Sequence, residues 1–141
     1  MENRGRWLFM SSTARRIDLP SGSDAPRRAR EWLGWVRAYL GPGQLENARL
    51  MLSELVTNSV QHAGLAQGDP IIVCARGSQR GIRVSVCDSG EGFQPEPPAL
   101  PPPHALGHRG LWMVKKLADA VTIDGAHGRV AFELGRRPSL S

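Results

Sequence analysis

The sequence predicts an α+β fold, a two-layer α/β sandwich in which helices cover one face of a mixed, mostly antiparallel β-sheet. The predicted elements run strand, helix, helix, strand, strand, loop, helix, strand, strand, which differs from the regular alternation of a doubly wound parallel sheet. The chain has 141 residues, of which 40% are hydrophobic and 22% charged, as in a globular domain with a sizeable core. We expect one domain at residues 13–135, between flexible arms at residues 1–12 and 136–141.

The first strand and helix follow from alternation and capping signals. Residues 14–19 alternate between apolar and polar side chains, which predicts a short edge strand. Asp24 can cap a helix that has Pro26 in its first turn and runs to about Leu40. The helix ends at the Gly-Pro-Gly break of residues 41–43. The side chains that it is expected to bury are Ala29, Trp32, Leu33, Val36 and Leu40.

A long central helix is predicted at residues 44–63, with Gly64 at its C-terminus. Its apolar residues recur near the 3.6-residue period of a helix with one buried face. Glu54, Asn58 and His62 are spaced by four, so they form a polar stripe along the same helix. The carboxylate and the carboxamide offer oxygen ligands to a hard cation such as Mg²⁺. Taken alone, the stripe also fits an ordinary solvated face.

The second half of the chain contains two pairs of strands and one helix. Residues 70–76 are nearly all apolar, which suits a strand covered on both faces, and residues 82–88 alternate cleanly. A short polar turn between them favours a β-hairpin. A third helix is expected at about residues 111–119, followed by closing strands at residues 120–123 and 130–134.

Cysteine usage and charge limit the class of protein. Cys74 and Cys87 lie in apolar strand-like segments, so we expect small buried residues in a reduced compartment rather than a disulfide or a zinc site. The apolar stretch at residues 7–10 is too short for a signal peptide or a membrane span, which predicts a cytoplasmic protein without a membrane partner. The formal charge is +5, but the arginines are scattered, so direct nucleic-acid binding is the least favoured function.

A strand-ending motif carries the first candidate binding site. Asp88 ends a predicted strand and is followed by Gly90 and Gly92. The two glycines let the backbone turn and approach a ligand closely. A carboxylate in that place can accept a hydrogen bond from an exocyclic amine such as the amino group of adenine. In isolation the same pattern also fits an ordinary turn.

A proline-rich segment and a second glycine pair follow. Residues 95–103 contain six prolines and cannot form a helix or a central strand, and so long a loop in a compact domain is usually functional. Gly107 and Gly110 then open a helix, whose N-terminal N–H groups suit a phosphate. Arg109 lies between them and can add charge-assisted bonds to a phosphate.

These three motifs, in this order and spacing, resemble those of the GHKL (Bergerat-fold) superfamily, which includes DNA gyrase B, histidine kinases and the mismatch-repair protein MutL. The resemblance covers roughly residues 14–134. Within the superfamily the chain looks most like the small bacterial anti-sigma-factor serine/threonine kinases. The run Ser-Glu-Leu-Val-Thr-Asn at residues 53–58 is typical of them, and the chain is little more than the ATP domain.

The resemblance implies ATP and Mg²⁺ as ligands and assigns a role to each motif. Asn58 would ligate the Mg²⁺ that bridges the phosphates, and Glu54 would be the general base that activates a substrate hydroxyl. Asp88 would bind the adenine amino group. Gly90 and Gly92 would shape the base pocket. The residues around the phosphates would be Gly107, Arg109 and Gly110. Residues 93–109 would form a lid.

The function implied by the resemblance is a Mg-ATP-dependent serine/threonine kinase. It would phosphorylate an anti-sigma-factor antagonist and sequester a sigma factor, and relatives of this type commonly form homodimers. One departure supports an alternative, a nucleotide-gated interaction module without kinase turnover. Many relatives carry a Thr just before the last strand, whereas residues 127–130 here are His-Gly-Arg-Val and have no hydroxyl.

Overall fold

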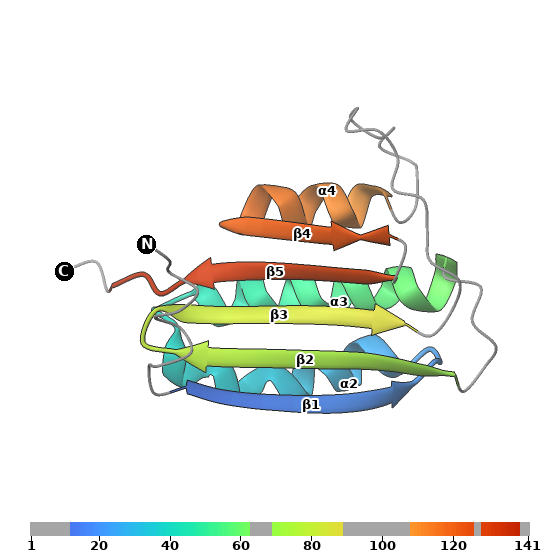
Figure 1. The fold of residues 1–141 in the computed structure, drawn as a ribbon, viewed down its shortest axis with the longest axis horizontal. Coiled ribbons are helices and arrows are strands. Elements are labelled where there is room, and N and C mark those ends of the chain that lie inside the picture. The colour runs from blue at the N-terminus through green and yellow to red at the C-terminus, as the bar shows by residue number, and fades with distance from the viewer. Residues whose placement is uncertain (1–11, 63–68, 89–107, 126–127, 139–141) are drawn as a thin grey trace.

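The structure, a computed structural model, describes residues 12–62, 69–88, 108–125 and 128–138 (Figure 1). The strands of these parts are β1 (Ser12–Pro20), β2 (Pro70–Ser78), β3 (Gly81–Asp88), β4 (Ala120–Asp124) and β5 (Arg129–Gly135). The helices are α2 (Ala25–Trp32), the 3₁₀ helix η1 (Leu33–Tyr39), α3 (Gln44–His62) and α4 (His108–Leu117). The order of strands and helices agrees with the sequence prediction, except that the 3₁₀ helix η1 replaces the second half of the first predicted helix.

The strands form a five-stranded sheet in the order β1-β2-β3-β5-β4, and the helices lie on one of its faces (Figure 1). The two-layer α+β class is therefore confirmed. All four pairings of these strands are antiparallel, in agreement with the expectation of a mostly antiparallel sheet. β2 and β3 form the predicted hairpin, with Ser78 opposite Gly81. The strands that are far apart in sequence, such as β1 and β2, also run in opposite directions.

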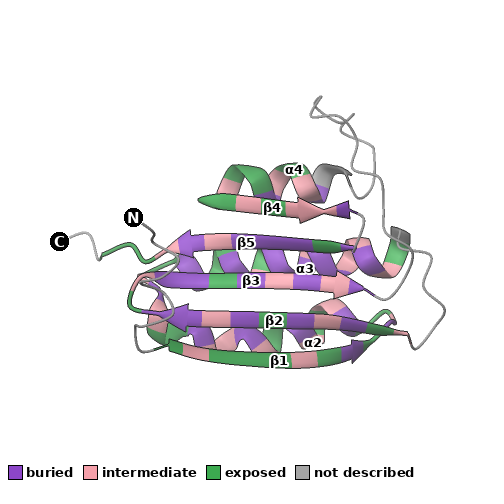
Figure 2. Ribbon diagram, in the orientation of Figure 1, coloured by how far each residue is buried: buried purple, intermediate pink, exposed green. Residues whose placement is uncertain are grey.

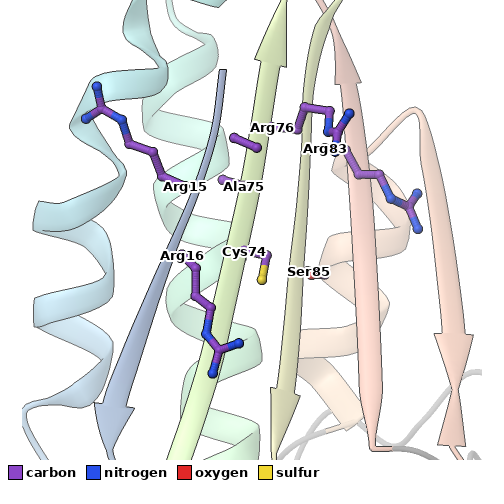
Figure 3. A pocket seen from close by; sticks show the side chains of 8 residues that line it. Arg15, Arg16, Cys74, Ala75, Arg76, Arg83 and Ser85 are labelled. Atoms are coloured by element: carbon purple, nitrogen blue, oxygen red, sulfur yellow. The ribbon is translucent and has the colours of Figure 1, made fainter. Parts of the chain in front are cut away.

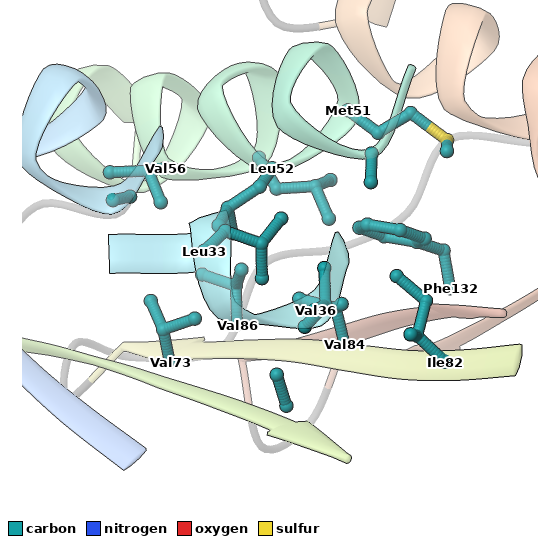
Figure 4. Close-up of a cluster of buried hydrophobic side chains, with 14 of the residues drawn as sticks. Leu33, Val36, Met51, Leu52, Val56, Val73, Ile82, Val84, Val86 and Phe132 are labelled. Carbon is teal, nitrogen blue, oxygen red and sulfur yellow. The ribbon is translucent and has the colours of Figure 1, made fainter. Parts of the chain in front are cut away.

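The core lies between the helices and one face of the sheet (Figure 4). Along β3 the side chains alternate, so that Ile82, Val84 and Val86 are buried under the helices while the intervening side chains face outward (Figure 2). Phe132 of β5 is fully buried in the same layer. The largest fully buried side chains that the helices contribute are Leu33, Val36, Met51, Leu52 and Val56.

The predicted helix from Asp24 to Leu40 is wrong in its second half, because the α-helix ends at Trp32 and continues as the 3₁₀ helix η1. Glycine, aromatic and β-branched residues in this stretch lower the intrinsic preference for an α-helix. Tertiary contacts also fix its course. The Tyr39 hydroxyl lies 2.7 Å from Thr13 Oγ1, and the guanidinium of Arg15 stacks 4.8 Å from the centre of the Trp35 ring.

Asp24 occupies the position before α2, but its side chain makes no capping hydrogen bond. Its backbone is in the helical region, with φ −92° and ψ −4°, whereas a capping side chain normally needs an extended backbone. The first turn is instead fixed by backbone bonds. Ala25 N donates to Gly22 O at 3.1 Å, and Arg28 N donates to Asp24 O at 3.0 Å.

The expectation that both cysteines are buried is also wrong. Both are free thiols; Cys74 is exposed and Cys87 is half-buried. Helices cover only one face of β2, so the apolar run at residues 70–76 is not buried on both faces as expected. Cys74 and Cys87 lie on the uncovered face of the sheet, because their cross-strand partners Ser85 and Ile72 alternate with buried residues.

The side chain of Gln44 joins the start of α3 to the end of β5. Its Oε1 accepts hydrogen bonds from Gly41 N at 2.8 Å and from Arg137 N at 2.9 Å, and its Nε2 donates to Gly135 O at 2.7 Å. The residue is buried, so losing these bonds leaves backbone groups without partners. Gln44 therefore fixes the helix against the last strand.

Replacing Gln44 by Ala is expected to lower the free energy of unfolding by about 1–2 kcal/mol, the usual cost of breaking a buried hydrogen-bond group. Chemical denaturation followed by circular dichroism measures this change. Asn47→Ala is the matched control, because Asn47 is exposed on the same helix. Equal destabilisation by the two substitutions would show that the hydrogen bonds of Gln44 contribute no more stability than an exposed side chain on the same helix.

Candidate functional site

Helix α3 carries two of the predicted site residues, Glu54 and Asn58, one turn apart. Both are half-buried, while Leu55 and Val56 between them are buried against the sheet. The helical period therefore places the polar stripe at the margin of the core rather than on a fully solvated face. An amide oxygen and a carboxylate at such a margin remain within reach of a ligand.

The first turn of α4 is in contact with Glu54. A β-carbon built on Gly110 would lie 2.7 Å from Glu54 Oε2 and 3.3 Å from Glu54 Cβ. Gly110 is buried, and the absence of a side chain there lets α4 approach the carboxylate. The structure thus brings together the predicted phosphate-binding glycine and the predicted base, although 56 positions separate them in the chain.

Asp88 lies at the end of β3 on the face that the helices cover. Asp88 continues the alternation of Val84 and Val86, and it is only 8% exposed. Ser59 Oγ, on the next residue after Asn58, donates a hydrogen bond to Asp88 Oδ2 at 3.4 Å. Helix α3 therefore connects the Glu54 and Asn58 stripe directly to the carboxylate of Asp88.

Gly128, just before β5, lies against the other oxygen of Asp88. Its carbonyl accepts a hydrogen bond from Asp88 N at 3.2 Å, and a β-carbon on it would lie 2.7 Å from Asp88 Oδ1. Its φ is +61°, a conformation that favours glycine. The two oxygens of Asp88 therefore have different neighbours, a serine hydroxyl at Oδ2 and a glycine backbone at Oδ1.

Ser59 and Gly128 were not among the residues predicted to form the site. The signal for Ser59 was present, since a hydroxyl directly after Asn58 falls toward the apolar side of the helix. The stretch around Gly128 was noted only for its missing hydroxyl. Its contact with Asp88 depends on the register between β3 and β5, in which Cys87 lies opposite Arg129.

Replacing Gly128 by Ala is expected to weaken ATP binding about threefold to tenfold and to cost about 1–2 kcal/mol of stability, because an L-residue is strained at positive φ and the methyl group would displace Asp88. Calorimetric titration and thermal unfolding measure the two effects. Gly43→Ala is the matched control, since Gly43 has φ +81° and nothing within 4 Å of its added β-carbon. An equal loss of affinity in the control would mean that contact with Asp88 is unimportant.

Other predicted site residues lie outside the described part of the chain. These are Gly90, Gly92 and Gly107, together with nearly all of the expected lid at residues 93–109. Arg109 belongs to the first turn of α4, but the placement of its side chain is not described. Their roles remain predictions.

The described residues have the donor types that Mg-ATP needs. Asn58 and Glu54 supply amide and carboxylate oxygens, and Mg²⁺ in nucleotide sites is commonly held by one or two protein oxygens together with phosphate oxygens. Within residues 12–62, 69–88, 108–125 and 128–138, no group of three or more His, Cys, Asp or Glu side chains is placed to hold a metal ion. In the same ranges, no helix has both the length and the hydrophobicity to cross a membrane.

The chain matches a family model, and eleven chains of solved structures are similar to it. The family model of the histidine kinase-like ATPase domain matches residues 21–132. The crystal structure of the RsbU and RsbW domains of Rv1364c from Mycobacterium tuberculosis is similar in fold, with a TM-score of 0.63 and 22% sequence identity. The match covers 89% of this chain but 32% of that one, so the chain spans about a third of the solved protein. No curated protein matched the sequence.

Proposed function

Because the chain belongs to the histidine kinase-like ATPase domain family, we propose that it is an ATP-binding regulatory protein of the anti-sigma-factor type with serine/threonine kinase activity. Family membership implies nucleotide binding, and the kinase activity is the proposal. The observation that carries it is the convergence of Glu54, Asp88 and Gly110 around helix α3. The same helix also carries Asn58, so one rigid element positions four of the predicted site residues.

In this proposal Asp88 binds the amino group of adenine. Ser59 donates a hydrogen bond to its Oδ2, and its Oδ1 lies on the side of Gly128, where an added β-carbon would come within 2.7 Å of it. A carboxylate accepts from an amine, whereas the keto oxygen of guanine would face it with a second acceptor. The arrangement therefore favours ATP over GTP.

Asn58 would hold Mg²⁺ through its amide oxygen, and the bound ion would supply charge neutralisation at the phosphates. Glu54 would take the proton from the hydroxyl of the acceptor Ser or Thr as that oxygen bonds to the γ-phosphorus, while the bond from this phosphorus to the bridging oxygen breaks and ADP leaves. The contact with Gly110 fixes the Glu54 carboxylate next to the start of α4. Predicted phosphate contacts come from the same helix start, which would place base and phosphate close together.

The proposed partners are a sigma factor and an anti-sigma-factor antagonist that carries the acceptor hydroxyl. The support is the fold shared with the RsbW domain of the solved protein and the anti-sigma-factor resemblance of residues 53–58. The alternative is a nucleotide-gated interaction module without turnover. It is favoured by Gly128, because the residue that contacts Asp88 from the start of β5 has no hydroxyl.

A single-turnover assay separates the two functions. The full chain is mixed with ATP labelled on the γ-phosphate, Mg²⁺ and candidate antagonist proteins, and label on protein Ser or Thr is measured. Transfer that depends on both Mg²⁺ and the antagonist supports the kinase. Tight Mg-ATP binding without transfer to any candidate supports the interaction module, and absence of ATP binding contradicts both.

A further inference from the structure

The face of the sheet that the helices leave uncovered has a shallow hollow over β1, β2 and β3 (Figure 3). Its volume is about 360 Å³. The register defines its floor, because Arg16 lies opposite Cys74 and Cys74 lies opposite Ser85. The short side chains of Cys74 and Ser85 leave space above the sheet, and the longer arginines surround it.

The rim of the hollow is basic. The lining residues include Arg15, Arg16, Arg76 and Arg83 and no carboxylate, but the guanidinium of Arg15 lies over Trp35 on the helix side, so the open face carries the guanidinium groups of Arg16, Arg76 and Arg83. Arg16 donates to Asp18 and Arg83 to Glu133, and the side chains of both pairs are exposed. Within the described parts of the chain, the guanidinium of Arg76 has no hydrogen-bonded or ion-paired partner.

Arg76 is also directly opposite Arg83 in the pairing of β2 with β3. Like charges directly opposite each other across two strands are destabilising. The cross-strand neighbour of Arg76 on the other side is Ala14, which offers no compensating charge. Glu133 already compensates the charge of Arg83, so Arg76 is the arginine of this pair that an anion over the hollow would neutralise.

From these observations we propose that the hollow binds an acidic segment of another protein, with an Asp or Glu carboxylate on Arg76, between the paired guanidinium groups of Arg16 and Arg83. An extended chain advances about 3.3–3.6 Å per residue, and β1 to β3 are about 10 Å apart, so two or three residues cross the hollow. Guanidinium groups bind carboxylates in bidentate geometry. The open-face residues that the structure describes include no aromatic ring on which a base could stack, which disfavours nucleic acid.

This surface goes beyond nucleotide binding and lies on the opposite face of the sheet from Asp88. The side chain of Asp88 is buried under the helices, whereas Cys74 and Arg83 are exposed on the uncovered face. A substitution in the hollow should therefore leave ATP affinity unchanged. Measuring peptide binding and ATP binding on the same protein sample therefore distinguishes failure of this proposal from failure of the proposed ATP site.

The test is fluorescence anisotropy of a labelled eight-residue peptide of alternating Glu and Ser, titrated with the full chain. Binding is expected for the Glu peptide and not for a matched Gln peptide. Arg76→Glu is expected to weaken binding about tenfold, since charge reversal replaces attraction by repulsion at the centre of the hollow. Arg37→Glu is the matched control, because Arg37 is exposed on η1 and the charge change is the same.

Equal weakening by Arg76→Glu and Arg37→Glu would overturn the proposal, because bulk charge alone would then explain binding. Failure of the wild-type chain to bind the Glu peptide would overturn it as well. Tighter binding of a single-stranded oligonucleotide of equal charge would assign the hollow to nucleic acid instead. The chain could also form a dimer in sedimentation that the substitution Arg76→Glu dissociates and the peptide leaves intact. That result would assign the hollow to a second copy of the chain instead. Unchanged ATP affinity confirms that the Arg76→Glu chain is folded.

Discussion

Replacing Glu54 by Gln is expected to lower the rate of phosphotransfer about 10²–10⁴-fold, the usual contribution of a positioned general base, while ATP affinity stays within about twofold. The carboxamide has nearly the same shape as the carboxylate, so the contact with Gly110 is preserved. It cannot accept the proton of the acceptor hydroxyl. The measurement is single-turnover transfer of the γ-phosphate, paired with calorimetric titration of ATP.

Glu46→Gln serves as the control for this experiment. Glu46 is exposed in the first turn of the same helix, so the substitution changes the net charge equally without touching the site. Transfer by the Glu46 variant should equal that of the wild type. A Glu54 variant with full activity would eliminate Glu54 as the base, and a variant with lost ATP affinity would make it a binding residue instead.

Replacing Asp88 by Asn is expected to weaken ATP binding about 10- to 100-fold, because a hydrogen bond to a charged group contributes roughly 1.5–3 kcal/mol. The amide would also present an N–H group where the adenine amino group needs an acceptor, unless it turns so that this N–H group faces the Ser59 hydroxyl, which would then accept instead of donate. Calorimetric titration with ATP and GTP, each with and without Mg²⁺, measures the loss and the change in preference.

Asp18→Asn is the appropriate control, since Asp18 is an exposed aspartate on β1 that pairs with Arg16. It should bind ATP like the wild type. If both variants bind ATP normally, the base pocket lies elsewhere. If the wild type prefers GTP or is indifferent to the base, the assignment of Asp88 to adenine is wrong even though nucleotide binding persists.

Much of the site was predictable because its positions follow from periods of secondary structure. Alternation along β3 places Asp88 on the same face as Val84 and Val86, and the helical period places Glu54 and Asn58 on one stripe. Both periods are visible in a short stretch of the sequence. The two-layer fold followed in the same way from the grouping of helices and strands.

The unpredicted features all depend on contacts between distant segments. The 3₁₀ helix η1 follows from packing of its aromatic side chains on β1, and the contact of Gly128 with Asp88 depends on the register of β5 against β3. The exposure of Cys74 depends on which face of the sheet the helices cover. These arrangements depend on packing between segments that are distant in the chain, so the local patterns of a single sequence do not reveal them.

The pairing of β1 with β2 also affects how the chain folds as it is synthesised. Ser12 pairs with Ser78 and Pro20 with Pro70, so each residue of β1 precedes its partner by 50 to 66 positions. At about 5–20 residues per second, the ribosome would release β1 roughly 3–13 s before β2 is complete. An unpaired strand is prone to aggregate during such a delay, and charged side chains reduce that risk. Arg15, Arg16 and Asp18 place three charges in the middle of β1 and would keep the nascent strand soluble until its partner emerges.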